Sequence, residues 1–74
     1  MYTFTIEETT AVNAKREGVG VTKEFKNLAQ AKRYASRNQA FYGTVLNIFN
    51  QHRTLLAYKS VGEWFNTPDA ADYL

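Results

Sequence analysis

The stretch NLAQAKRYASRN, residues 27–38, decides the fold because it carries the clearest helical pattern in the chain. Asn27 is a favourable N-cap residue, and Gln30 follows three positions later, as in a capping box. The interior is filled with alanine, leucine, glutamine, lysine and arginine, which are all good helix formers. This pattern predicts a helix that begins after Asn27 and ends near Asn38 or Gln39.

The predicted helix has two unlike faces when its residues are placed 100° apart. Mostly small or apolar side chains share one face and allow the helix to lie close to a sheet: Leu28, Ala31, Tyr34, Ala35 and Asn38. Arg33 and Arg37 fall on the opposite face with Gln30 between them, and Lys32 lies beside them. Repulsion between the two arginines costs roughly 0.2–0.5 kcal/mol. The helix dipole offsets this cost only at Arg37, near the C-terminal end.

A candidate binding surface follows from these positive charges on one short helix. It comprises Lys26, Gln30, Lys32, Arg33 and Arg37. Side chains of this kind contact phosphates or acidic proteins. The alternative is a solvated face without a partner.

The segments before and after the helix alternate as strands do. The first strand begins at Tyr2, where aromatic and aliphatic residues alternate with threonine, and is expected to extend as far as Val12. A turn over residues 13–20 leads into a second strand, and the two form an antiparallel hairpin. The second strand is expected at residues 19–25, and three further strands at residues 44–49, 55–59 and 63–66. A polar turn is expected at residues 50–53, and a helix of one or two turns after Thr67. The order β-β-α-β-β-β predicts an α+β fold, in which one antiparallel sheet of about five strands has one α-helix packed on one face.

A chain of 74 residues is expected to form a single domain, residues 1–74. Cysteine is absent, so disulfides cannot stabilise it, and five Phe, five Tyr and one Trp are expected to supply the core. We expect five large side chains to be mostly buried: Phe4, Leu28, Leu46, Tyr58 and Trp64. The alternative is that some of these rings stack on nucleic-acid bases. No apolar run approaches the roughly 20 residues of a membrane span, and no signal peptide is recognisable, so we expect a cytoplasmic protein without a membrane partner.

The charge is unevenly distributed along the chain. The formal net charge is +2, but residues 15–37 hold seven basic and two acidic side chains, a local charge of +5. Segregation of this kind indicates an anionic partner for one side of the protein. A basic face that only maintains solubility is the alternative.

Catalytic and metal-binding patterns are not recognisable. One His and no Cys cannot build a structural zinc site, so no metal or cofactor is expected, and His52 is expected to be exposed in a turn. Ser36 and Ser60 lack the surroundings of an activated nucleophile. Glu7 and Glu8 point to opposite faces of a strand, so we expect one to be solvated and the other to face the sheet edge. These features favour a binding protein over an enzyme, without a small-molecule substrate.

The helix and the strands after it resemble a known family. The residues that carry the resemblance are the run Ala31 to Gln39, then Phe41, Gly43 to Leu46, Ile48, Leu56 to Lys59, Gly62 and Trp64. They resemble small phage-encoded anti-CRISPR proteins that inhibit type I-F CRISPR-Cas systems. The resemblance implies a sheet with one helix, and binding to the backbone subunits of the guide-RNA surveillance complex in the bacterial cytoplasm, which blocks pairing of target DNA with the guide. The implied contact residues are Lys32, Arg33, Arg37, Gln39 and Phe41.

Other functions remain open at this point. A small nucleic-acid-binding module would contact phosphates through the same helix, and its affinity would fall steeply with salt. Both activities can coexist if the bound inhibitor leaves basic side chains free to attract DNA. An accessory virion or toxin–antitoxin component is a third possibility. If the helix is only a solvated face, the functional surface would lie on the open side of the sheet, among Thr3, Thr5, Asn47 and Lys59.

Overall fold

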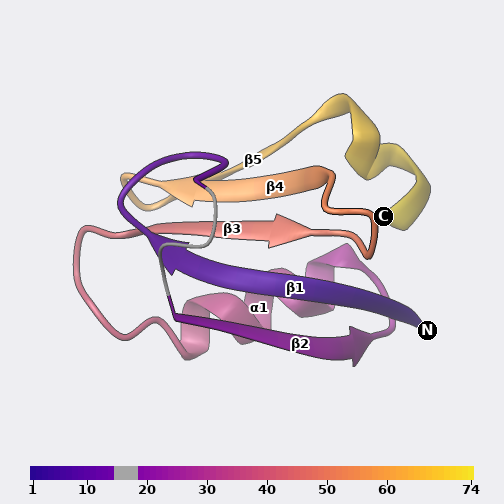
Figure 1. The fold of residues 1–74 in the computed structure, drawn as a ribbon, viewed down its shortest axis with the longest axis horizontal. Helices are drawn as coiled ribbons and strands as arrows, with labels where there is room; N and C mark the ends of the chain where they lie inside the picture. Colours follow the sequence, from indigo (N-terminus) through magenta and orange to yellow (C-terminus); the bar gives the residue numbers. More distant parts are fainter. Residues whose placement is uncertain (15–18) are drawn as a thin grey trace.

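The computed structural model describes residues 1–14 and 19–74 and confirms the predicted fold class. In this part of the chain, a five-stranded antiparallel sheet has the order β2-β1-β3-β4-β5, with one α-helix behind β1 and β2 in the view of Figure 1. The elements are β1 (Tyr2–Thr9), β2 (Val19–Phe25), α1 (Leu28–Arg37), β3 (Val45–Phe49), β4 (Leu55–Ser60), β5 (Glu63–Asn66) and the 3-10 helix η1 (Pro68–Tyr73). The first strand ends before Val12, and residues 15–18 of the predicted turn lie outside the described residues.

The register of the sheet places the hydrophobic positions of the strands on one face. Ile6 in β1 lies opposite Val21 in β2 and Ile48 in β3, and Ile48 lies opposite Ala57 in β4. Side chains that lie opposite each other in a ladder share a face. Because a slip of one residue would turn each of these side chains to the opposite face of the sheet, away from the core under α1, the alternation fixes the register.

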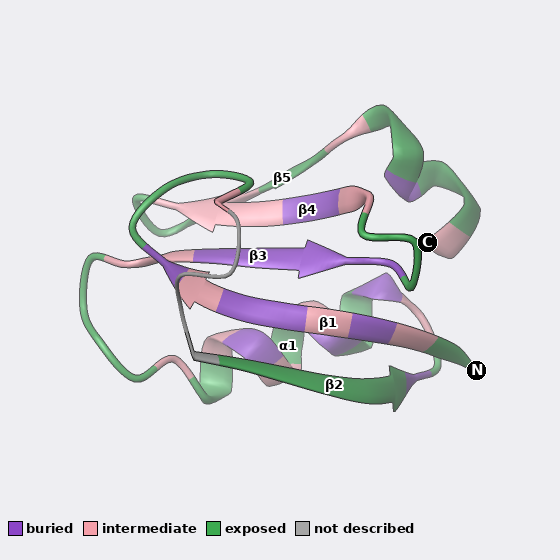
Figure 2. Cartoon of the chain, viewed as in Figure 1, coloured by how far each residue is buried: buried purple, intermediate pink, exposed green. Residues whose placement is uncertain are grey.

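Helix α1 covers this face and completes the core. The buried core residues are Phe4, Ile6, Phe25, Leu28, Ala31, Ala35, Leu46, Ile48, Leu56, Ala57 and Ala70. Figure 2 shows that burial is concentrated in β1, β3 and β4, whereas the edge strands β2 and β5 are mostly exposed. The small side chains of Ala31 and Ala35 are fully packed between the helix and the sheet, as their spacing predicted.

The predicted burial is complete for three of the large side chains and partial for two. Phe4, Leu28 and Leu46 are buried, but Tyr58 and Trp64 are only half-buried. Tyr58 lies opposite Asn47 on the face away from α1, where its ring stacks on Phe65 at 5.3 Å. Trp64 belongs to the edge strand β5, which has a neighbouring strand on one side. Its ring therefore covers the rim of the core instead of filling it.

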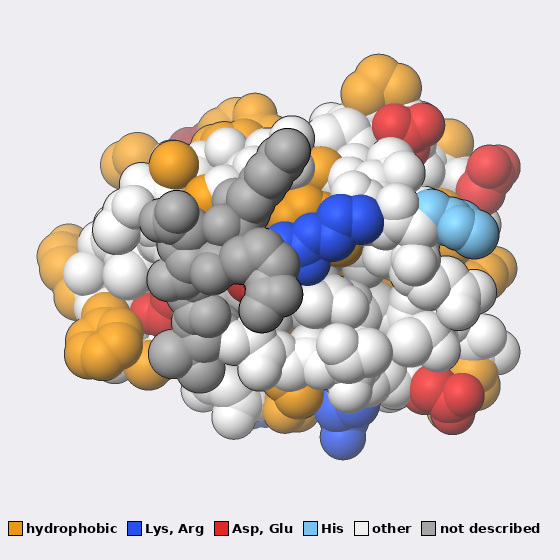
Figure 3. Space-filling model, viewed as in Figure 1, with side chains coloured by type: hydrophobic (Ala, Val, Ile, Leu, Met, Phe, Trp, Pro, Cys, Tyr) orange, Lys and Arg blue, Asp and Glu red, His pale blue; other side chains and the backbone are white. Residues whose placement is uncertain are grey.

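The second face of the sheet is closed over its centre by the segment that follows β1. Asn47 is fully buried there, and its side-chain oxygen accepts a hydrogen bond from the backbone N–H of Asn13 at 3.1 Å. Its amide nitrogen donates to the carbonyl of Ala11 and to the hydroxyl of Thr9. This face is turned to the viewer in Figure 3, where polar and backbone atoms make up much of the surface. Asn47 is therefore a structural residue and cannot serve an open functional face.

Glu7 is also buried on this second face. The guanidinium of Arg53 donates two hydrogen bonds to its carboxylate, at 2.8 and 2.9 Å, and lies 4.1 Å from the centre of the Phe49 ring. The expectation that Glu7 is solvated or faces the sheet edge is therefore wrong. A carboxylate becomes tolerable at a buried position when a bidentate arginine compensates its charge. The polar turn at residues 50–53 is confirmed, and His52 is exposed in it.

Candidate binding surface on the basic helix

Helix α1 begins as the sequence predicts. The side-chain oxygen of Asn27 accepts a hydrogen bond from the backbone N–H of Gln30 at 2.9 Å. The side-chain oxygen of Gln30 reaches back and accepts from the N–H of Lys26 at 2.6 Å. Gln30 is therefore engaged in capping the helix, while the Lys26 side chain beside it is exposed. The cap fixes the start of α1 and hence the direction in which its basic residues point.

Arg33 and Arg37 are both exposed on the side of α1 away from the sheet. Within residues 1–14 and 19–74, the single salt bridge joins Arg53 and Glu7. The two arginines of α1 therefore have no carboxylate partner in that part of the chain. Two exposed guanidinium groups about one helical turn apart, with no carboxylate partner among the described residues, are suited to bind carboxylates or phosphates.

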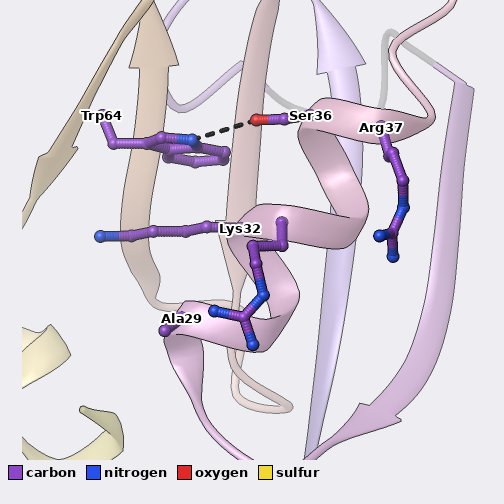
Figure 4. A pocket seen from close by; sticks show the side chains of 6 residues that line it. Ala29, Lys32, Ser36, Arg37 and Trp64 are labelled. Atoms are coloured by element: carbon purple, nitrogen blue, oxygen red, sulfur yellow. Dashed lines mark hydrogen bonds between the residues drawn. The ribbon is translucent and has the colours of Figure 1, made fainter.

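Lys32 lines the same depression as the two arginines, but its ammonium group is held against the edge strand. Its ammonium group donates a hydrogen bond to the side-chain oxygen of Asn66 and lies 5.7 Å from the centre of the Trp64 ring. In Figure 4, Lys32 extends alongside Trp64, whereas Arg37 points to the other side of the helix. Partial burial lowers the pKa of Lys32. We call Lys32, Arg33 and Arg37 the basic surface.

A shallow depression lies between the basic surface and β5. It is lined by Ala29, Lys32, Arg33, Ser36, Arg37 and Trp64. The hydroxyl oxygen of Ser36 accepts hydrogen bonds from Trp64 Nε1 and from Lys59 Nζ, both at 3.2 Å. Lys59 thus lies on the helix side of the sheet, and its expected place on the open side is wrong. Sequence reasoning missed Trp64 as a surface residue because it treated the aromatic residue as core.

Gln39 and Phe41 lie in the segment that joins α1 to β3, which we call the contact loop (residues 38–44). Gln39 is half-buried, and its amide nitrogen donates to the hydroxyl of Thr44 at 3.0 Å. Phe41 is 63% exposed, and the neighbouring Tyr42 is fully exposed. The contact loop follows directly from the C-terminal end of α1, so these residues extend the basic surface toward one end of the molecule.

Glu8, in strand β1, forms hydrogen bonds that hold the contact loop in place. Its carboxylate accepts hydrogen bonds from the N–H groups of Ala40 and Phe41, each at 2.8 Å, and from the hydroxyl of Thr44 at 2.6 Å. Burial raises the pKa of Glu8, but these three hydrogen bonds together lower it below the ordinary value. The expectation that Glu8 is solvated or faces the sheet edge is therefore wrong.

The chemistry of this surface is that of recognition. It offers guanidinium and ammonium groups, an exposed aromatic ring and an indole. Among the described residues, no three His, Cys, Asp or Glu side chains gather as metal ligands would. No helix in the described ranges has the length and apolar character needed to cross a membrane.

Comparison with known proteins identifies the family. No model of a protein family matches the chain, and no curated protein matches it. The solved structure of AcrIF9 superposes on this one with a TM-score of 0.72 and 38% sequence identity, over 90% of this chain and 88% of that chain. Identity at this level over nearly the whole of both chains reflects a family relationship as well as a shared fold. The chain therefore belongs to the AcrIF9 family of type I-F anti-CRISPR proteins.

Proposed function

We propose that the protein inhibits its target by binding the backbone subunits of the type I-F guide-RNA surveillance complex through the basic surface, so that target DNA cannot pair with the guide. The inhibitor acts by occupancy and without catalytic turnover, in the cytoplasm of the bacterial host. The observation that carries this proposal is the pair of exposed arginines on α1, whose charge has no partner among the described residues. The family relationship supplies the type of target.

The basic surface is well suited to bind a protein or RNA–protein complex tightly. Its charges stand on a capped helix, so the backbone that carries them is already ordered before binding. A standard interface buries about 800 Å² on each partner. Helix α1 has ten residues and is therefore about 15 Å long, which is too short to supply that area alone. The contact loop lies next to it and provides the additional surface, including the exposed ring of Phe41.

Direct contact with nucleic acid is the second candidate function. It is favoured by the position of Trp64, a half-buried indole in the same depression as Arg33 and Arg37. Arginines contact phosphates, and an accessible indole can stack on a base. The protein would then contact DNA through the same basic surface, either instead of the complex or while bound to it.

The test is a pull-down from a lysate that contains a type I-F surveillance complex, with and without nuclease. We expect capture of the complex at a fixed stoichiometry that survives removal of free nucleic acid. Arg33→Ala with Arg37→Ala should abolish capture, since truncating charged contacts at an interface costs about 2–5 kcal/mol each. Lys23→Ala is the control for a single charge, because Lys23 is exposed on β2 and lies near Tyr34, outside the basic surface.

Each outcome has a distinct meaning. Capture that disappears with nuclease, with an affinity that falls linearly on a log scale of salt concentration, would favour the nucleic-acid module. If the double arginine variant captured the complex as well as the parent protein, the basic surface would be only a solvated face. Equal loss in Lys23→Ala would indicate that net charge, and not the position of the arginines, determines binding.

A further inference from the structure

Glu8 occupies an unusual position for an acid beside a basic surface. It lies on the helix side of β1, opposite Leu46, and projects to the start of β3; within residues 1–14 and 19–74 it forms no salt bridge with a lysine or arginine. Its carboxylate accepts two backbone N–H groups and one hydroxyl, all from the contact loop. The loop is thus clamped at its middle by a residue more than thirty positions away in the sequence.

The hydrogen bonds of Glu8 are relayed to Gln39 through Thr44. The hydroxyl of Thr44 donates to Glu8 at 2.6 Å, a length typical of a bond to a charged acceptor. The hydroxyl has a second acceptor within reach, the carbonyl of Phe41 at 2.9 Å, and only one proton for the two. Toward Gln39 it can therefore only accept, and the carbonyl of Thr44 can also only accept. The amide of Gln39 must therefore turn its NH₂ group toward Thr44. Its carbonyl oxygen has no hydrogen-bond donor in the part of the chain that the structure describes, so it can accept a hydrogen bond from a partner.

The two ends of the contact loop are held by their own local interactions, and the middle of the loop is held by hydrogen bonds to Glu8. At the helix end, the backbone N–H and the side chain of Asn38 both donate to the carbonyl of Tyr34, at 3.1 and 2.9 Å. At the strand end, Gly43 turns the chain with a φ of 85°, a conformation that favours glycine. Between them, the N–H groups of Ala40 and Phe41 have Glu8 as their hydrogen-bond acceptor.

We propose that Glu8 is a positioning residue for partner binding: it holds the contact loop so that Gln39 and Phe41 face the same partner as the basic surface. This inference rests on the proposed function, because it concerns the same interface. Glu8 itself does not touch the partner. It acts through Thr44 and through the backbone of Ala40 and Phe41.

When Glu8 is neutralised, the positioning role predicts a change in binding affinity opposite in sign to the change that simple electrostatics predicts. If Glu8 were only an acid near the basic surface, its neutralisation would make the protein more positive and strengthen binding to an anionic partner. If Glu8 positions the contact loop, Glu8→Gln weakens binding although the net charge becomes more positive. Glu63→Gln is the matched control, because Glu63 is exposed and its removal changes the net charge by the same amount.

The experiment measures affinity for the purified surveillance complex, together with amide hydrogen exchange by NMR in the free protein. We expect Glu8→Gln to weaken binding about tenfold, since it replaces a charged acceptor of three hydrogen bonds by a neutral one. Exchange at Ala40 and Phe41 should become at least about tenfold faster, while exchange in β3 is unchanged. Glu63→Gln should bind as tightly as the parent or slightly tighter. Thr44→Val, which removes the relay and leaves Glu8 in place, should reproduce part of the loss.

A double-mutant cycle separates positioning from a general loss of structure. In a protein that already carries Gln39→Ala and Phe41→Ala, Glu8→Gln should weaken binding no further, because the residues that it positions are gone. An additional tenfold loss in that background would overturn the proposal, as would unchanged exchange at Ala40 and Phe41 or an unchanged affinity in Glu8→Gln. If any of these three outcomes were found while the parent protein bound the complex and the arginine variant did not, only the role of Glu8 would be refuted, and the proposed function would stand. Failure of the parent protein to bind the complex would instead refute the proposed function and, with it, the role of Glu8 at that interface.

Discussion

Replacing Arg53 should destabilise the protein without weakening its binding surface. Arg53 caps the second face of the sheet, where it forms a bidentate salt bridge with Glu7 and lies over the ring of Phe49. Arg53→Met removes the charge but keeps an unbranched side chain over the ring. The carboxylate of Glu7 would then stay buried on the sheet with no compensating charge among the described residues.

The magnitude follows from the exposure of the two side chains. An exposed ion pair contributes at most about 1 kcal/mol, whereas breaking a fully buried pair costs about 3–5 kcal/mol. The side chain of Glu7 is 10% exposed and that of Arg53 is 40% exposed, so the pair lies between these limits. We expect a loss of roughly 2 kcal/mol, which lowers Tm by about 8–16 °C in a domain of this size.

The assay is urea unfolding followed by circular dichroism, with Arg37→Met as the control. Arg37 is exposed and has no carboxylate partner among the described residues, so its replacement should change the unfolding free energy by less than about 0.5 kcal/mol. Glu7→Gln combined with Arg53→Met should recover part of the loss, because no buried charge is then left alone. A loss in Arg53→Met no larger than in Arg37→Met would show that the salt bridge contributes as little as an exposed one.

Two further predictions concern the helix cap and the contact loop. Asn27→Ala should lower the unfolding free energy by roughly 0.5–2 kcal/mol in urea unfolding, because the N–H of Gln30 loses its acceptor; an unchanged midpoint would show that this cap contributes nothing. The pKa of Glu8 is lower in the folded state than in the unfolded chain, so its contribution to stability is fully present above the unfolded pKa. That contribution should be lost as the pH falls through the lowered folded pKa, and the amide shifts of Ala40 and Phe41 should follow the same titration by NMR. Amide shifts that titrate at the ordinary glutamate pKa would contradict the hydrogen bonds to Glu8.

The sequence alone determined the elements of the fold, because these depend on short-range patterns. The helix, its cap at Asn27 and its buried alanines follow from residues within one or two turns of each other. The strands follow from alternation with period two, and the order of the elements then leaves an antiparallel sheet with one helix as the simplest packing. The exposed basic residues of α1 could be placed by the same periodicity. The resemblance to anti-CRISPR proteins came from residues 28–64, which contain α1, β3 and β4 but not the first two strands.

The tertiary structure decided which side chains serve the core and which serve the surface. Trp64 and Tyr58 look like core residues in the sequence, but the edge position of β5 and the face of β4 leave both half-buried. Helical periodicity places Lys32 beside the arginines, but its contacts with Asn66 and Trp64 hold its ammonium group at the sheet edge.

The adjacent acids Glu7 and Glu8 show the physical reason most clearly. Both looked like ordinary polar strand residues. Glu7 is compensated by Arg53, 46 positions away, and Glu8 by Thr44, 36 positions away, on opposite faces of the sheet. A local pattern gives the direction of a side chain, but the partner that makes a buried charge stable is fixed only when distant segments pack together.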